Sequence, residues 1–192
     1  MRTAKISRKT NETKINIELN IDGEGKYSVE SPIGFLTHMI QTFSKFGNFD
    51  LQMKVKGDLE VDQHHTIEDC GIVLGKAFNQ ALGDKKGINR AGYFVYPMDE
   101  ALAVAAVDLG GRPYLQFDAK FARRFCGDLD TDLVYDFFEA FAFNLEANIV
   151  VRMPYGRSDH HKIESIFKAF GKAMKMACSK DVKGILSTKG VI

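Results

Sequence analysis

The sequence contains no long apolar segment and few cysteines. Its longest apolar run, Ala101 to Val107, has seven residues, whereas a membrane-spanning helix needs roughly 20. The N-terminal segment is polar and lacks the apolar core of a secretory signal. Three cysteines occur without a CxxC spacing, which indicates neither a disulfide framework nor a thiolate metal site. We therefore expect a cytoplasmic protein in a reducing environment.

An excess of either charge is also absent. The 192 residues include 26 Lys and Arg against 25 Asp and Glu, for a formal net charge of +1. The chain therefore lacks the basic surface that nucleic acids and anionic membranes require, and neither is an expected partner. No GxGxxG or GxxxxGK[ST] motif occurs, which disfavours the usual modes of nucleotide binding.

The hydrophobic pattern, in contrast, is pronounced and repeats. In the first half it predicts strands at 14–21, 26–31 and 49–55, a hairpin turn at 22–25, and helices at 32–46 and 64–82. In the second half it predicts strands at 92–97, 101–109, 113–119 and 148–153 and helices at 131–147 and 160–177. We interpret each half as strand, strand, helix, strand, helix, with one more strand before the first helix of the second half. This predicts an internally duplicated α+β fold whose half-repeats, 1–86 and 87–192, share one core.

A repeated histidine motif is the clearest sign of duplication. HHxxE occurs at 64–68 and again at 160–164, 96 residues later, each time where a helix is predicted to begin. Adjacent helical side chains diverge by about 100°, whereas the glutamate shares a face with either histidine. The pattern suggests two metal sites that each draw on both copies, with donors that fit Mn, Fe(II), Ni, Co or Zn. One such pair alone is more often solvated or capping.

Two further positions follow from the duplication. His38 precedes His64 by 26 residues, and Asp136 precedes His160 by 24, each on the first helix of its half. His38 is therefore a candidate metal ligand, and Asp136 is its candidate counterpart. The alternative for Asp136 is an exposed acid on a helix.

Several cations adjoin flexible backbone, as they do where proteins hold a phosphate. Arg90, Arg112 and Lys189 lie in or beside glycine-containing segments, and Lys168 lies one to two turns after the second motif. Taken singly, each is more often only a solubilising surface residue.

Longer segments surround these motifs: GFLTHM (34–39), GDLEVDQHHTIEDCGIVLGKA (57–77), ALGDKKGINR (81–90), GGRPYL (110–115), DHHKIESIFKAFGKAM (159–174) and STKG (187–190). Together they resemble the imidazoleglycerol-phosphate dehydratases of histidine biosynthesis, essentially from end to end of the chain. The doubled HHxxE with these flanks makes the resemblance highly specific.

The resemblance implies two similar halves, each with a four-stranded sheet backed by helices, and a homo-oligomer of about 24 subunits with active sites between chains. It implies two Mn²⁺ ions per active site, with ligands at His38, His64, His65, Glu68, His160, His161 and Glu164. The substrate's phosphate would bind Arg90, Arg112, Lys168, Ser187 and Lys189, and its polar end would contact Glu12.

The implied reaction removes water from imidazoleglycerol phosphate to give imidazoleacetol phosphate. A metal-bound imidazolate would expel the hydroxyl group through a diazafulvene-like intermediate, with Glu164 or Glu12 transferring the proton. Many relatives carry histidine where this chain has Asp136, glutamine where it has Thr42 and histidine where it has Phe46. An acid at Asp136 is a competent ligand for a hard metal, so we expect a retained site with a somewhat altered metal preference. The changes at Thr42 and Phe46 concern contacts around the ligands or with the substrate and leave the metal core unchanged.

Two other functions share these residues. A binuclear metallohydrolase would use the same ligands on another phosphorylated substrate. A metal-storage or metal-sensing shell would need the ligands but would leave the phosphate-binding residues without a purpose.

Overall fold

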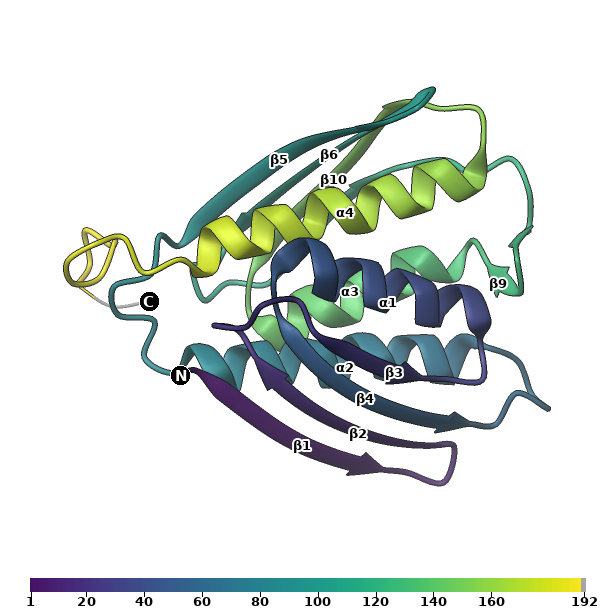
Figure 1. The fold of residues 1–192 in the computed structure, drawn as a ribbon, viewed down its shortest axis with the longest axis horizontal. Helices are drawn as coiled ribbons and strands as arrows, with labels where there is room; N and C mark the ends of the chain where they lie inside the picture. The colour runs from purple at the N-terminus through teal and green to yellow at the C-terminus, as the bar shows by residue number, and fades with distance from the viewer. Residues whose placement is uncertain (191–192) are drawn as a thin grey trace.

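The computed structural model describes residues 1–190, whose elements form two matched series (Figure 1). The first series is β1 (Thr3–Lys9), β2 (Thr13–Asn20), β3 (Tyr27–Glu30), α1 (Gly34–Gly47), β4 (Asp50–Gly57) and α2 (His64–Leu82). The second is β5 (Ala91–Met98), β6 (Ala101–Asp108), β7 (Tyr114–Asp118), α3 (Leu133–Leu145), β10 (Asn148–Tyr155) and α4 (Asp159–Cys178). A hairpin of β8 (Phe125–Cys126) and β9 (Leu129–Asp130) is inserted before α3. The two similar halves expected from the sequence are confirmed.

Each half forms a four-stranded sheet of the same topology. The strand orders are β1-β2-β4-β3 and β5-β6-β10-β7, and in each sheet only the last pair is parallel. The helices lie between the sheets (Figure 1), with α2 packed on α3 and α1 on α4. The predicted α+β class, with a helix-backed sheet in each half, is confirmed. Within residues 1–190, no helix has both the length and the apolar character to cross a bilayer.

Alternating side chains explain which face of a sheet is buried. On β2 and β4 the buried face consists of the cross-strand pairs Ile15 with Val55, Ile17 with Met53, and Leu19 with Leu51. A shift of one residue would turn this apolar set toward solvent, so burial of one face specifies the register.

Two predictions about the first half are wrong. Thr3–Lys9 is a strand, so each half has three strands before its first helix. Its inward positions are Ala4, Ile6 and Arg8, and a weakly apolar alternation of this kind gives little signal. The segment 22–25 is not a hairpin, because β4 lies between β2 and β3. Asp50 instead accepts hydrogen bonds from the backbone N–H groups at 24 and 26, at 2.9 and 3.0 Å.

Phenylalanines fill the layer where the helices meet. Phe43 of α1 stacks on Phe170 of α4 with ring centroids 5.2 Å apart, and both rings contact Phe141 of α3. Helices α2 and α3 approach closely at Gly71 and Gly75, where a Cβ atom would lie 2.4 and 2.6 Å from backbone carbonyl oxygens of α3. This packing sets the positions of the helix ends, where the histidines lie.

Candidate active site

The first turn of α4 carries the second histidine motif. Ser158 caps this helix, since its side chain accepts a hydrogen bond from the His161 N–H at 3.4 Å. His160 Nε2 lies 3.1 Å from Glu164 Oε2, and His38 Nε2 of α1 lies 3.6 Å from the same oxygen. Ligand atoms of His38, His160 and Glu164 all lie within 4.8 Å of one another. We call these three residues the α1–α4 group.

Glu164 is the most enclosed member of this group. Its side chain is 11% exposed, against 48% for His38 and 49% for His160. Lys168 Nζ lies 2.9 Å from Glu164 Oε1. Burial by itself raises the pKa of Glu164, but the hydrogen bond and charge of Lys168, with the charge of His38, outweigh it and lower the pKa. Glu164 is therefore an ionised carboxylate at neutral pH.

A similar arrangement occurs at the corresponding place in the first half. His64 begins α2, and its Nδ1 lies 3.8 Å from Oδ2 of Asp136 on α3. Glu68 follows His64 by four residues on the same helix and so shares its face. Burial raises the pKa of Asp136, partly offset by His64. We call His64, Glu68 and Asp136 the α2–α3 group; its role as a ligand set stays a prediction.

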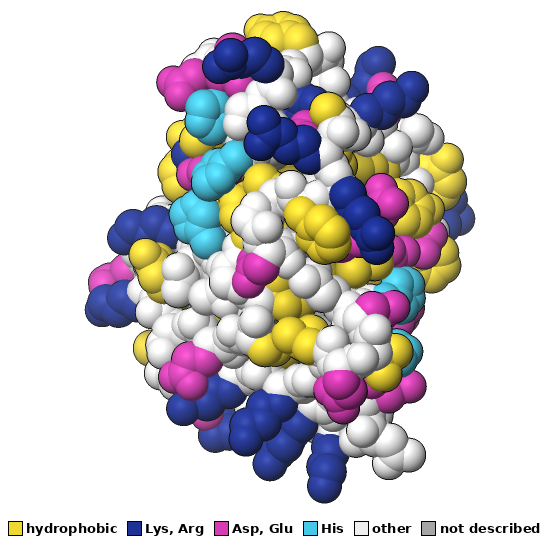
Figure 2. Space-filling view, turned by 90° about the vertical axis from the view of Figure 1, so that its right-hand side faces the viewer, with side chains coloured by type: hydrophobic (Ala, Val, Ile, Leu, Met, Phe, Trp, Pro, Cys, Tyr) yellow, Lys and Arg dark blue, Asp and Glu magenta, His cyan; other side chains and the backbone are white. Residues whose placement is uncertain are grey.

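The second histidine of each motif diverges from the first. The ring centroids of His64 and His65 are 6.3 Å apart with ring planes at 80°, and those of His160 and His161 are 6.0 Å apart at 86°. Figure 2 shows the histidine side chains in two separate patches on one face of the molecule. The two adjacent histidines of each motif therefore point their imidazole rings in different directions.

Each of these diverging histidines has a carboxylate on its Nδ1 atom. His65 Nδ1 lies 3.1 Å from Asp58 Oδ2, and this hydrogen bond raises the pKa of His65. His161 Nδ1 lies 2.8 Å from Glu100 Oε2, and this bond lowers the pKa of Glu100 to about 2. The sequence prediction missed Asp58 and Glu100. The one local feature that marks them in the sequence is their position, since Asp58 directly follows β4 and Glu100 directly precedes β6.

Glu12, the predicted contact of the substrate's polar end, lies in the turn between β1 and β2. Its Oε1 lies 3.7 Å from His65 Nε2, and its side chain is 50% exposed. The structure thus brings Glu12 to the side of His65 opposite to Asp58.

Most predicted phosphate-binding residues gather around the start of β5. Arg90 donates to both carboxylate oxygens of Asp108 at 2.6 and 3.0 Å, and to the Leu186 carbonyl oxygen at 2.6 Å. The last bond ties the C-terminal segment to this end. Arg112 follows β6, whose last residue pairs with the first residue of β5, and Ser187 and Lys189 follow Leu186 in the C-terminal segment.

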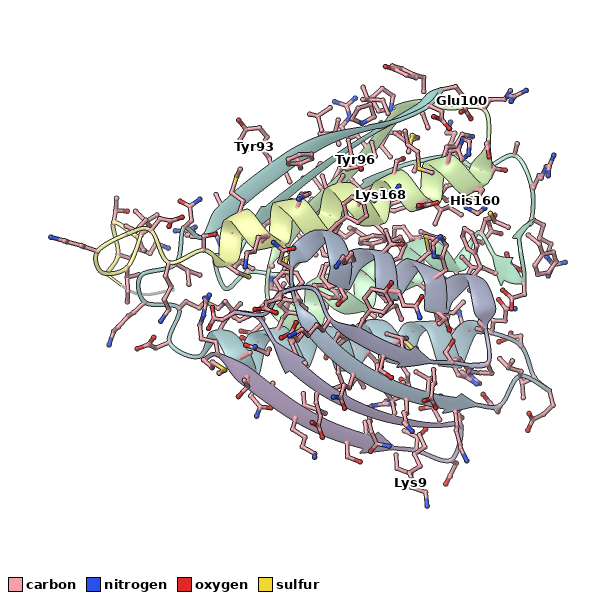
Figure 3. The ribbon with its side chains drawn as sticks, in the orientation of Figure 1. Lys9, Tyr93, Tyr96, Glu100, His160 and Lys168 are labelled. Atoms are coloured by element: carbon pink, nitrogen blue, oxygen red, sulfur yellow. The ribbon has the colours of Figure 1, made fainter. Side chains whose placement is uncertain are left out.

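This end lies far from the histidines within one chain. Strand β5 has eight residues and is therefore about 26 Å long. Arg90 precedes it, and Glu100 follows it at the histidine end. Figure 3 shows Glu100 and His160 at the end of the molecule opposite the C-terminal segment. One chain therefore keeps the Arg90 end apart from the histidines.

Lys168 has a different environment. Its Nζ lies 5.2 Å from the ring centroid of Phe46 and 5.4 Å from that of Tyr96, as well as 2.9 Å from Glu164. Figure 3 shows Lys168 and Tyr96 where α4 faces β5. The side chain is only 13% exposed. The two rings and the carboxylate therefore hold the ammonium group in place.

The donor chemistry of both groups fits a divalent metal ion. Each group combines imidazole nitrogen with carboxylate oxygen, the donors expected for Mn²⁺ and for the later first-row metals. The cysteines are all buried, and burial raises the pKa of Cys178 to about 12 and that of Cys70 further. A thiolate site is therefore disfavoured, as the sequence predicts.

A hairpin of the second half holds the first turn of α1. Asp128, between β8 and β9, accepts hydrogen bonds from the N–H groups of Gly34 at 2.6 Å and Phe35 at 2.8 Å. Gln63, directly before the first motif, donates to the Asp128 carbonyl oxygen at 2.5 Å. One hairpin thus fixes the starts of α1 and α2, which carry ligands of different groups.

The fold and these groups define the class of protein: an internally duplicated α+β enzyme whose halves present imidazole and carboxylate donors at corresponding helix ends. A family model described as imidazoleglycerol-phosphate dehydratase matches residues 31–174. The chain therefore belongs to the imidazoleglycerol-phosphate dehydratase family, which makes it a hydro-lyase of histidine biosynthesis.

Relatives of this name match along the whole chain. The imidazoleglycerol-phosphate dehydratase of Koribacter versatilis is 55% identical over 195 residues, and that of Lactiplantibacillus plantarum is 54% identical over 194; both alignments cover 100% of each protein. The Staphylococcus aureus crystal structure superposes with a TM-score of 0.84 at 35% identity, covering 93% of this chain and 99% of that one. The Pyrococcus furiosus structure gives 0.85 at 31% identity, covering 97% and 100%.

Proposed function

We propose that the chain converts D-erythro-imidazoleglycerol phosphate into imidazoleacetol phosphate and water with two Mn²⁺ ions per active site. The α1–α4 group carries this proposal, because its three ligand atoms lie within 4.8 Å of one another. The α2–α3 group supports it, with His64 3.8 Å from Asp136. His65 and His161 add further imidazoles that point elsewhere, as ligands of a neighbouring ion would.

The reaction needs an electron sink, because the hydrogen that is lost is bound to a carbon with no adjacent carbonyl group. The imidazole ring of the substrate is the available sink, and bound metal ions supply Lewis acidity toward it. The basic residues bind the phosphate, and this binding energy, remote from the reacting carbons, orients the ring.

Glu12 suits proton transfer better than Glu164. Both oxygens of Glu164 are engaged, one by Lys168 at 2.9 Å and the other by His160 at 3.1 Å. Glu12 is half exposed, and its Oε1 lies 3.7 Å from His65 Nε2. We infer that Glu164 binds metal and that Glu12 moves the proton, a role worth about 10²- to 10⁴-fold in rate. Glu12→Gln should therefore lower kcat while Mn²⁺ content stays unchanged.

We further propose a cytoplasmic homo-oligomer of about 24 copies with active sites between chains. The length of β5, eight residues or about 26 Å, separates Arg90 from the histidine end. A substrate made of a ring, three carbons and a phosphate is far shorter than this. A phosphate bound at the Arg90 end therefore requires the histidines of another chain. The buried, unpaired cysteines support a reducing compartment.

The test is to strip the protein with a chelator, restore Mn²⁺, and follow the formation of imidazoleacetol phosphate. We expect turnover only with metal, at about two ions per chain. Full metal uptake without turnover would favour the metallohydrolase or the storage shell. Turnover by the stripped protein would contradict metal dependence.

A further inference from the structure

We propose that Glu100 is a positioning residue that fixes the tautomer of His161, so that Nε2 of this ring is free to bind metal. The inference rests on the proposed function, in which His161 is a metal ligand. Glu100 lies in the turn between β5 and β6, at the histidine end of the molecule (Figure 3).

Both oxygens of Glu100 accept hydrogen bonds from the start of α4. Oε2 lies 2.8 Å from His161 Nδ1, and Oε1 accepts from the Ser158 N–H, also at 2.8 Å. An ionised carboxylate accepts and does not donate, so the ring proton of His161 resides on Nδ1 and the free lone pair on Nε2. Ser158 also accepts from the His161 N–H. Glu100 and Ser158 therefore hold both the backbone and the ring of His161.

Glu100 does not itself have the geometry of a metal ligand. Asp99, Glu100 and His161 place ligand atoms within 4.8 Å of one another, but one Glu100 oxygen accepts from the backbone N–H of Ser158 and the other faces a single imidazole. In the α1–α4 group, by contrast, two imidazoles converge on one oxygen of Glu164. Asp99 Oδ2 lies 3.9 Å from His161 Nδ1, and its side chain is 77% exposed. The contact that orders this cluster is thus the hydrogen bond from Nδ1 to Glu100. Ligating histidines are commonly oriented in this way by a carboxylate on their other nitrogen.

The first half achieves the same contact from a different position. Asp58, which orients His65 through Nδ1 at 3.1 Å, follows β4. The turn that corresponds to the Glu100 turn is the one between β1 and β2, and it carries Glu12 on the Nε2 side of His65. The two halves have therefore diverged at this turn: in one it supplies the positioning carboxylate, and in the other it leaves Glu12 free for proton transfer.

Glu100→Gln tests the role directly, because an amide offers one acceptor oxygen where Glu100 uses two. If the oxygen accepts from Ser158, the NH₂ group faces His161 Nδ1 and forces the ring proton onto Nε2. If the amide is flipped, its NH₂ group opposes the Ser158 N–H. Asp99→Asn is the matched control, since it removes the same charge beside the same ring from an atom 3.9 Å away, beyond hydrogen-bonding distance.

The measurement is Mn²⁺ affinity of the metal-stripped full-length protein, from the electron paramagnetic resonance signal of free Mn²⁺. We expect Glu100→Gln to weaken binding about 10- to 100-fold and Asp99→Asn by less than about 3-fold, as for an exposed charge. In a His161→Ala background, Glu100→Gln should cause no further loss, because the proposal assigns the whole effect of Glu100 on metal binding to this ring. Thermal unfolding without metal verifies that each variant is folded.

Equal losses in Glu100→Gln and Asp99→Asn, or a loss that adds to that of His161→Ala, would overturn the positioning role. A wild-type protein that binds no Mn²⁺ would refute the proposed function and this inference with it. A wild-type protein that binds Mn²⁺ and dehydrates the substrate, beside a Glu100→Gln variant of equal affinity, would refute the positioning role alone.

Discussion

Replacing Asp128 by alanine should destabilise the fold, although this residue lies on an exposed hairpin far in sequence from the helix it caps. Its two oxygens accept from the N–H groups of Gly34 and Phe35 at 2.6 and 2.8 Å. The residue at the N-cap position itself is Ile33, which makes no side-chain cap. Loss of an N-cap acceptor costs about 0.5–2 kcal/mol, and loss of a charge at a helix N-terminus about 0.3–1 kcal/mol.

Together these two contributions amount to about 1–2 kcal/mol, because solvent weakens both at an exposed site. This corresponds to a fall in Tm of about 2–8 °C for a chain of this length. The assay is urea denaturation and thermal unfolding at one fixed protein concentration, without metal. Asp128→Asn keeps one acceptor and should lose about half as much. Asp181→Ala, which removes an exposed acid from the C-terminal segment, is the control for charge. Equal stability of the Asp128→Ala and Asp181→Ala proteins would refute the capping argument.

Three further predictions concern other contacts. Gly71→Ala should lower the free energy of unfolding by about 1–3 kcal/mol in denaturant, although alanine has the better helix propensity, because the new Cβ would lie 2.4 Å from the Phe137 carbonyl oxygen. An increase in stability would contradict the close approach of α2 and α3. Lys168→Ala should lower kcat/KM roughly 10- to 100-fold, because it removes a charge-assisted contact with the substrate's phosphate. Its Mn²⁺ content should stay unchanged, since an ammonium group cannot bind a cation; loss of metal from this variant would refute this division of roles. Arg2 lowers the pKa of Asp22 from 3.8 to about 2, so the ionised carboxylate stabilises the fold above pH 3.8, and this contribution disappears as the pH falls toward 2. In acid unfolding, the stability of Asp22→Asn should therefore fall less steeply over this range than that of the wild type, and an equal slope would contradict the coupling.

Local patterns in the sequence predict much of this protein. Helix α2 spans His64–Leu82, as predicted, because its apolar spacing and its final glycine lie within the segment itself. The HHxxE copies, spaced 96 residues apart, predict duplication for the same reason, since a repeat is visible without knowledge of any contact. The spacing of the repeat also predicts that His38 and Asp136 occupy corresponding positions, and each lies beside the first histidine of a motif.

Contacts between distant segments required the tertiary structure. Strand β1 forms although its inward positions are weakly apolar, because it pairs along its whole length with β2. The carboxylates on the histidine Nδ1 atoms come from Asp58 and Glu100, seven and 61 residues away from their partners.

The fold class, the repeat and the types of donor can be predicted from the amino-acid sequence, because periodicity and residue chemistry are local properties. The folded chain shows in addition which donors meet, which carboxylate orients which ring, and that Arg90 lies a strand's length from the histidines. These features depend on how helices and strands pack, and packing joins residues that no local pattern connects.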